Sequence, residues 1–178
     1  GIVQNSGAEV TCPLTAHAVA GQTLVLEKLV CIRTSRDADE RIAAAPGDWS
    51  FHALWGAHTA AWSHTWQNCD RTLPDEELQI GLRYSMFQLM ASCAAHDPTV
   101  SIGARGLTHA RYKGCYFWDT DLFMLPFFLK NDKTAAKNLC LYRANALDAA
   151  RDHAKKMNAA GARYPWMAAL DGSEQCET

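Results

Sequence analysis

The chain has 178 residues, of which 48% are hydrophobic and 20% charged; this composition is typical of a globular protein and argues against a disordered one. Its 17 basic and 19 acidic residues give a formal net charge of -2, which argues against a general nucleic-acid binder because such proteins need a basic face. No apolar run approaches the ~20 residues that span a bilayer, and residues 1–7 show no signal-peptide pattern.

The residue types that bind metals or form disulfides are scattered. No Cys-x-x-Cys pair and no zinc-type Cys/His spacing occurs, and His52, His58 and His64 recur at intervals that do not bring metal ligands together. We therefore predict no metal site. We also predict reduced thiols in a cytoplasmic protein, most of them buried as small apolar side chains. The seven cysteines are Cys12, Cys31, Cys69, Cys93, Cys115, Cys140 and Cys176.

The first 35 residues have the composition of strands. Residues 23–33 are rich in β-branched and apolar side chains and predict one strand of about ten residues. Residues 10–12 predict a second, short strand that Pro13 closes. Two strands do not make a stable sheet alone, so we expect this segment to pair with something outside the chain, or the chain to begin part-way through a domain.

The middle of the chain has a helical pattern. Residues 37–45 predict a short helix, and Ser50 predicts the cap of a helix that runs to about Cys69. Acidic residues within 74–77 predict the start of the next helix, which ends near Ala95. The first long helix carries one stripe of tryptophans, at Trp55, Trp62 and Trp66. The second has a predicted buried face made by Leu78, Leu82, Ser85, Met86, Leu89 and Cys93.

The second half alternates long loops with apolar helices. An apolar helix is predicted over residues 122–129, interrupted by Pro126, and one long helix is predicted from residues 131–132 to about Asn158. The loops at 97–121 and 161–178 concentrate aromatic, charged and glycine residues. Loops of that length in a helical domain are commonly functional.

The first of these loops carries the most informative chemistry. Trp118 and Asp119 place an aromatic ring beside a carboxylate. A ring can cover the apolar face of a sugar, and a carboxylate can accept hydrogen bonds from two neighbouring hydroxyls. The ordinary alternative is that Trp118 lies in the core and Asp119 only caps a helix. Residues 161–166 allow the same two interpretations, a binding loop or a packed aromatic turn.

The carboxylates near the end of the chain are acid catalysts by residue type only. Glu174 and Glu177 lie in a segment that is more often simply solvated. Hydrolysis of a glycosidic bond needs two carboxylates on opposite sides of that bond, and the sequence pairs neither glutamate with a second one. No GxSxG, P-loop or HExxH motif offers another chemistry.

A series of short motifs follows along the second half in a fixed order, at residues 104–108, 112–114, 117–126, 141–143 and 161–166. In this order they resemble glycoside hydrolase family 65, which contains inverting disaccharide phosphorylases and some hydrolases. The resemblance implies a mainly α fold in three parts. These are the C-terminal end of a β-sandwich domain (residues 1–35), a helical linker (36–96) and the N-terminal part of an (α/α)6 barrel catalytic domain (97–178).

The resemblance also implies an activity. The parent enzyme would cleave an α-glucosyl disaccharide with inorganic phosphate and inversion, giving β-glucose 1-phosphate and a free sugar, without a cofactor. Trp118 and Asp119 match the pair that binds the non-reducing glucose. The family's general acid is a glutamate in a Gly-Pro-Asp-Glu-Tyr-His motif that is absent here, so we expect it C-terminal to residue 178. Neither Glu174 nor Glu177 matches that motif.

Some features stay open at this point. Residues 109–111 and Cys115 depart from the family pattern, which leaves the acceptor sugar undetermined. Two alternatives to phosphorolysis are hydrolysis of an α-glucoside and, if the chain ends at Thr178, a non-catalytic helical fragment. For the isolated chain we expect no activity and marginal solubility, because an unclosed barrel exposes apolar helix faces. The resemblance further implies a homodimer of the full-length protein. The charge balance and the lack of a long apolar run argue against a nucleic-acid or membrane partner.

Overall fold

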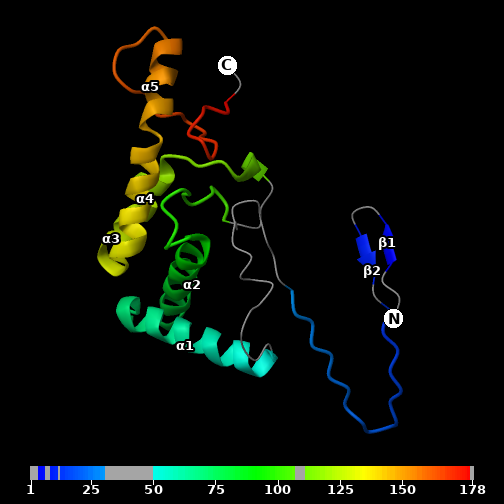
Figure 1. The fold of residues 1–178 in the computed structure, drawn as a ribbon. Coiled ribbons are helices and arrows are strands. Elements are labelled where there is room, and N and C mark those ends of the chain that lie inside the picture. Colours follow the sequence, from blue (N-terminus) through cyan, green and yellow to red (C-terminus); the bar gives the residue numbers. More distant parts are fainter. Residues whose placement is uncertain (1–3, 7–8, 12, 31–49, 107–110, 177–178) are drawn as a thin grey trace. The chain divides into compact units, whose positions relative to one another are not determined.

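A computed structural model describes residues 4–6, 9–11, 13–30, 50–106 and 111–176, and Figure 1 shows the fold. This described part is mainly helical, as predicted. The chain groups into two compact units, residues 1–63 and 64–178. No helix among the described residues has both the length and the apolar character needed to cross a membrane.

The first unit contains a small hairpin. β1 (Gln4–Ser6) pairs antiparallel with β2 (Glu9–Thr11), and Asn5 lies opposite Val10. The short strand predicted at residues 10–12 is therefore confirmed for its described part. The end of a β-sandwich expected over residues 1–35 is not seen in the described residues, where one two-stranded hairpin is the whole sheet.

The longer strand predicted in this unit is wrong over residues 23–30. The backbone there forms no regular element, and Val25 is 80% exposed. A β-branched, apolar sequence favours a strand only when a neighbouring strand accepts and donates the ladder hydrogen bonds, and none lies beside it among the described residues. Residues 31–33 and the helix predicted at 37–45 lie outside the described residues.

α1 (Phe51–Cys69) begins where the sequence predicts. The Oγ of Ser50 accepts a hydrogen bond from the backbone N–H of Ala53 at 3.3 Å, which is the geometry of an N-cap. His58 lies between two tryptophans of the predicted stripe, with its ring 5.8 Å from Trp55 and 6.2 Å from Trp62. This histidine therefore packs against aromatic rings along the helix.

In the second unit, α2 (Glu76–Ser92) begins at Asp75, whose carboxylate accepts the backbone N–H of Leu78 at 2.8 Å. The predicted buried face is only partly correct. Met86 is buried, whereas Leu78 is 64% exposed. The reason is that the core cluster of this unit contacts Leu89 near the C-terminus of α2 and Cys93 just after the helix.

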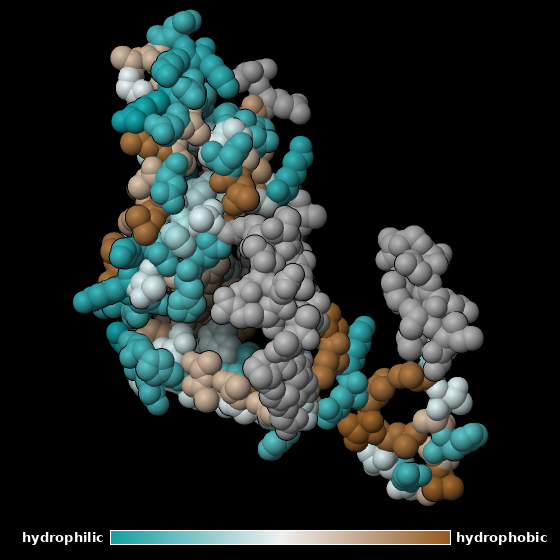
Figure 2. Space-filling view, in the orientation of Figure 1, coloured by the Kyte–Doolittle hydropathy of each residue, from teal (hydrophilic) through white to brown (hydrophobic). Residues whose placement is uncertain are grey.

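The remaining helices gather in one column in Figure 1, with α5 at the top of the view and with α3 and α4 in contact with each other below it. A short 3-10 turn, η2 (Arg111–Gly114), precedes them. The column consists of the π-helix η3 (Thr120–Met124), α3 (Leu125–Asn131), α4 (Lys133–Asn145) and α5 (Leu147–Lys156). Their core cluster is Ile102, Phe128, Ala135, Ala136 and Leu139. Figure 2 shows hydrophilic side chains gathered over α5, at the top of that view.

Two helix starts in this column follow from local sequence. Pro126 lies in the first turn of α3, where a missing N–H breaks no helical hydrogen bond. Asp132 caps α4, and its Oδ1 accepts the backbone N–H groups of Thr134 and Ala135 at 3.0 and 2.9 Å. The predicted start of α4 is thus confirmed. The apolar helix predicted from residue 122 begins later as an α-helix, at Leu125, so that Pro126 lies in its first turn and does not interrupt it.

The single long helix predicted up to residue 158 is wrong, because it divides at Ala146 into α4 and α5. Ala146 is buried, and a Cβ built on Gly172 would come within 2.8 Å of its Cβ. The division therefore lies where the C-terminal segment crosses the helix at close range. The local sequence favours helix throughout, so only this contact between distant segments marks the position of the break.

Candidate functional site

Trp118 lies in the loop before η3, and contacts at the edge of its indole ring fix its position. Its indole Nε1 donates a hydrogen bond to the backbone oxygen of Pro165 at 2.9 Å. Its ring meets that of Trp166 in an edge-to-face arrangement, with 5.7 Å between centroids. Trp118 is nevertheless 44% exposed. The side chain is therefore not a core residue: it is a fixed ring with much of its surface open to solvent.

Asp119 stands directly before η3 and does not act as a cap. Its backbone is helical, at φ -53° and ψ -35°, and its side chain makes no capping hydrogen bond. Its side chain is exposed. The ordinary interpretation of Trp118 as core and Asp119 as an N-cap is thus contradicted at both residues.

A narrow strip of backbone pairing brings the two aromatic loops together. The N–H of Tyr116 donates to the backbone oxygen of Ala168 at 2.9 Å, and the N–H of Ala168 donates back at 2.8 Å. Gly103 pairs with Tyr116 on its other side, and Glu174 pairs with Ala168. The bridge between Tyr116 and Ala168 joins segments that are far apart in sequence and sets Trp118 beside Trp166.

Behind the Trp118 loop, the guanidinium of Arg143 on α4 forms an ion pair with Asp121. The Nε and Nη2 atoms of Arg143 each lie 2.8 Å from Asp121 Oδ2. Nη2 also donates to the backbone oxygen of Phe117 at 3.1 Å. The rings of Tyr142 and Tyr164 lie 5.5 and 5.8 Å from the guanidinium carbon, distances at which a cation is attracted to an aromatic ring.

Glu174 anchors the Trp166 loop. Its carboxylate accepts the backbone N–H groups of Trp166 at 2.7 Å, Met167 at 3.0 Å and Cys176 at 3.0 Å. Burial tends to raise the pKa of this carboxyl, but the backbone hydrogen bonds outweigh it and lower the pKa below its ordinary value. An ionised side chain already occupied by the backbone is a poor general acid. Glu177 lies outside the described residues.

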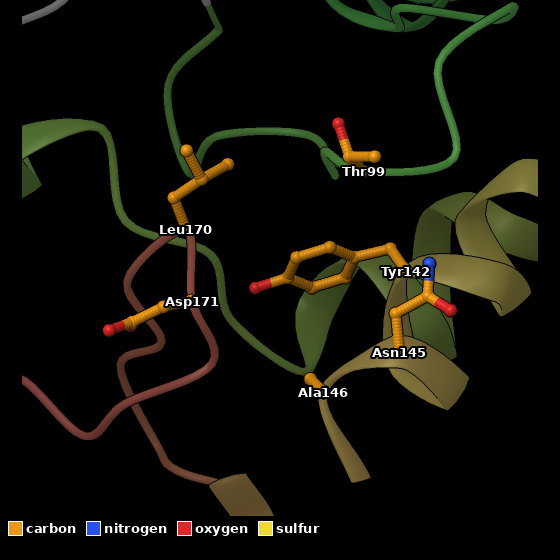
Figure 3. Close-up of a pocket in the computed structure, with 6 residues that line it drawn as sticks. All are labelled: Thr99, Tyr142, Asn145, Ala146, Leu170 and Asp171. Carbon is orange, nitrogen blue, oxygen red and sulfur yellow. The ribbon is translucent and has the colours of Figure 1, made fainter. Parts of the chain in front are cut away.

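A cavity of about 150 Å³ lies beside this site and is shown in Figure 3. The ring of Tyr142 lies between Thr99 and the segment that carries Leu170 and Asp171. The Tyr142 hydroxyl donates to the backbone oxygen of Ala169 at 3.0 Å, and burial raises the pKa of Tyr142 to about 12, so it stays neutral. Asp171 accepts hydrogen bonds from Ser173. The Tyr142 hydroxyl and the Asp171 carboxylate are thus already hydrogen-bonded to residues of the C-terminal loop. The residues that line the cavity include neither Trp118 nor Asp119.

The cysteines of the described segments are all free. Cys69 and Cys115 are buried, as predicted for most of them, but Cys140 and Cys176 are exposed, which corrects that prediction. Cys93 is half-buried, and this desolvation raises the pKa of its thiol to about 11.

Comparison with known proteins identifies the family. Residues 83–178 match the glycosyl hydrolase family 65 central catalytic domain. The chain belongs to this family. The predicted resemblance is therefore confirmed for the half of the chain that carries Trp118, Arg143 and Glu174.

Several relatives of this family 65 chain are disaccharide phosphorylases. It is 41% identical to the kojibiose phosphorylase of Caldanaerobacter subterraneus subsp. tengcongensis, over 86% of this chain and 21% of the relative. It is 35% identical to the α,α-trehalose phosphorylase of Thermoanaerobacter brockii, over 97% of this chain and 23% of the relative. It is also 35% identical to the maltose phosphorylase of Bacillus subtilis, over 84% of this chain and 21% of the relative.

A solved structure has the same fold over most of this family 65 chain. A provisionally named kojibiose phosphorylase from the human microbiome matches with a TM-score of 0.66 and 36% sequence identity, covering 72% of this chain and 17% of the other. The chain spans about a fifth of the length of the curated relatives that it matches.

The sequence alone indicated Trp118 and Asp119 but not the residues that hold them. Arg143 lies inside one of the motifs at 141–143, yet no rule of spacing pairs it with Asp121, which is 22 residues away. Glu174 was weighed only as an acid. The partner of Arg143 is decided by the packing of α4 against the Trp118 loop, and the partners of Glu174 by the turn of its own loop, and neither follows a spacing rule.

Proposed function

We propose that the polypeptide that carries this chain cleaves an α-glucosyl disaccharide by inverting phosphorolysis, giving β-glucose 1-phosphate and a free sugar. Membership of family 65 and the phosphorylase relatives support the reaction class. The observation that carries the proposal is the pair Trp118 and Asp119, a fixed but open ring beside a carboxylate with no capping task.

In this proposal the two side chains bind the non-reducing glucose. The indole of Trp118 covers the apolar face of the pyranose ring, and the Asp119 carboxylate accepts hydrogen bonds from two hydroxyls. Bonds to Asp119 that tighten as the ring flattens would favour the transition state over the ground state. The hydrogen bond from the Trp118 indole to Pro165 keeps the ring oriented before the sugar binds. This reduces the side-chain entropy that is lost on binding.

The bond-breaking groups belong to the proposal as well. A glutamic acid outside residues 1–178 protonates the glycosidic oxygen, since Glu174 is occupied by backbone N–H groups. Inorganic phosphate attacks the anomeric carbon from the opposite face, and because it is already anionic it needs no general base. No cofactor enters this scheme. Residues 1–178 by themselves would then be inactive.

The domain boundaries enter the same proposal. We assign residues 1–35 to the end of a β-sandwich, residues 36–96 to a linker and residues 97–178 to the start of an (α/α)6 barrel. The family match to the central catalytic domain covers all of residues 97–178 and also residues 83–96 at the end of the assigned linker. A cytoplasmic location and a homodimer of the complete polypeptide stay predictions.

The test measures products from the complete polypeptide with kojibiose, trehalose, nigerose and maltose, in the presence and absence of phosphate. We expect phosphate-dependent glucose 1-phosphate from at least one sugar, and a loss of about 100-fold in kcat/KM on Asp119→Asn. Asp148→Asn is the matched control, because that carboxylate is 91% exposed on α5. Glucose release without phosphate would establish the hydrolase instead. Full activity of Asp119→Asn would refute the role of the pair.

A further inference from the structure

One side chain from α4 contacts the residues on both sides of Trp118 and Asp119, through a backbone oxygen before the pair and a carboxylate after it. Arg143 Nη2 donates to the backbone oxygen of Phe117, which directly precedes the pair, at 3.1 Å. The same guanidinium forms an ion pair with Asp121, two residues after Asp119, at 2.8 Å. The pair is therefore fixed between two points that a single rigid fork defines.

The segment that Arg143 holds has an uncommon backbone. η3 (Thr120–Met124) is a π-helix, and the N–H of Leu125 donates to the backbone oxygen of Thr120. Such turns are rare and frequently occur at functional sites. One tertiary contact at its start is the Thr120 hydroxyl, which donates to the backbone oxygen of Ile102 at 3.1 Å. The other is the ion pair between Asp121 and Arg143. Both lie immediately after Asp119.

Arg143 also reaches the loop that meets the edge of Trp118. The hydroxyl of Tyr164 donates to the backbone oxygen of Arg143 at 3.0 Å, and its ring lies 5.8 Å from the guanidinium carbon. The next residue, Pro165, accepts the indole N–H of Trp118. The chain of contacts from Arg143 through Tyr164 and Pro165 thus returns to the same tryptophan.

The environment of Arg143 favours a positioning role over a simple contribution to stability. Its side chain is only 14% exposed, and its Nη1 is buried without a hydrogen-bond partner among the described residues. Burying a charge and leaving a donor unpaired are both unfavourable. The Phe117 carbonyl and the Asp121 carboxylate set the orientation of the Arg143 guanidinium, and Nη1 is left without a hydrogen bond in that orientation.

We propose that Arg143 is a positioning residue for glucose: it holds Trp118 and Asp119 in the geometry that binds the sugar, without touching the sugar itself. This inference rests on the glucose-binding part of the proposed function. It predicts that a lysine cannot replace Arg143, because an ammonium lacks the planar fork that reaches the Phe117 carbonyl and the Asp121 carboxylate together.

The test measures two quantities on the complete polypeptide, the dissociation constant for glucose by calorimetry and kcat/KM for phosphorolysis. We expect Arg143→Lys to raise the dissociation constant and to lower kcat/KM, each by about tenfold or more, since small displacements of binding groups have effects of this size. Arg151→Lys is the matched control, because Arg151 pairs with Asp148 on the surface of α5 and is 55% exposed. We expect wild-type values for this control.

A double-mutant cycle separates positioning from general destabilisation. Asp119→Asn should weaken glucose binding several-fold less in the Arg143→Lys background than in the wild type, because the carboxylate is already misplaced there. Additive effects would overturn the inference, as would an unchanged glucose affinity in Arg143→Lys. If Arg143→Lys does not melt cooperatively, Asp121→Asn decides in its place, since it removes only the ion pair. Wild-type protein that binds glucose but forms no glucose 1-phosphate would refute the proposed reaction and leave the Arg143 cycle measurable by calorimetry.

Discussion

Replacing Glu174 by glutamine should remove the hydrogen bond that fixes the backbone of Trp166. Glu174 Oε2 accepts the backbone N–H of Trp166, while Oε1 accepts those of Met167, Gln175 and Cys176. An amide has one accepting oxygen. If that oxygen keeps the three bonds of Oε1, an NH₂ group is turned toward the Trp166 N–H and that bond is lost.

The magnitude follows from the number of bonds that change. One hydrogen bond to a charged acceptor disappears, and the others lose the charge of their acceptor, which together give a cost of about 2 kcal/mol in the free energy of unfolding. The partial exposure of Glu174 keeps the figure at this level and not higher. Glu77→Gln, an exposed carboxylate in the first turn of α2, should change the same quantity by less than about 0.5 kcal/mol.

The pH dependence gives the prediction its sign. The pKa of Glu174 is lowered from its ordinary value of 4.5 in the folded protein. Its contribution is therefore fully present above pH 4.5 and is lost as the pH falls through the folded-state pKa. The assay is denaturant unfolding of the complete polypeptide at pH 7 and at decreasing pH. Equal stability of Glu174→Gln and wild type at pH 7, or a difference that does not shrink in acid, would refute this reasoning.

Three further changes test the packing of the second unit. Phe128→Ala empties the core and should cost about 3–5 kcal/mol in the free energy of unfolding, measured by denaturant titration, whereas Leu129→Ala, 58% exposed, should cost far less. Gly172→Ala should destabilise by about 1–3 kcal/mol in the same assay, because its Cβ would come within 2.8 Å of a side-chain carbon at the junction of α4 and α5. Iodoacetamide labelling followed by mass spectrometry should modify Cys140 well before Cys93, whose thiol is half-buried with its pKa raised to about 11.

Each of these has an outcome that contradicts it. Equal costs for the two alanine variants at residues 128 and 129 would mean that the core is not where the structure places it. A neutral Gly172→Ala would mean that the C-terminal segment does not cross the helix at close range. Labelling of Cys93 as fast as Cys140 would show that α2 is not covered at its C-terminal end.

Helix caps and helix starts could be predicted from the sequence wherever the hydrogen-bond partner lies only a few residues away in the chain. The caps at Ser50 and Asp132 were predicted because a side chain there reaches an N–H only two or three residues away. The position of Pro126 limited where α3 could begin for the same reason. The order of motifs in the second half gave the family, since it is a property of the chain itself.

The sequence by itself therefore determined the helical class and the starts of α2 and α4, and it indicated Trp118 and Asp119 as candidates for binding glucose. Only the tertiary structure decided that Asp119 is not a cap, that Arg143 and Glu174 are anchors, and that a long helical pattern divides at Ala146. The contacts of Arg143 and of Ala146 are with segments far along the chain, whereas Asp119 and Glu174 depend on the backbone geometry of their loops. Propensity and periodicity describe only how a segment folds against its nearest neighbours, so they cannot specify such contacts.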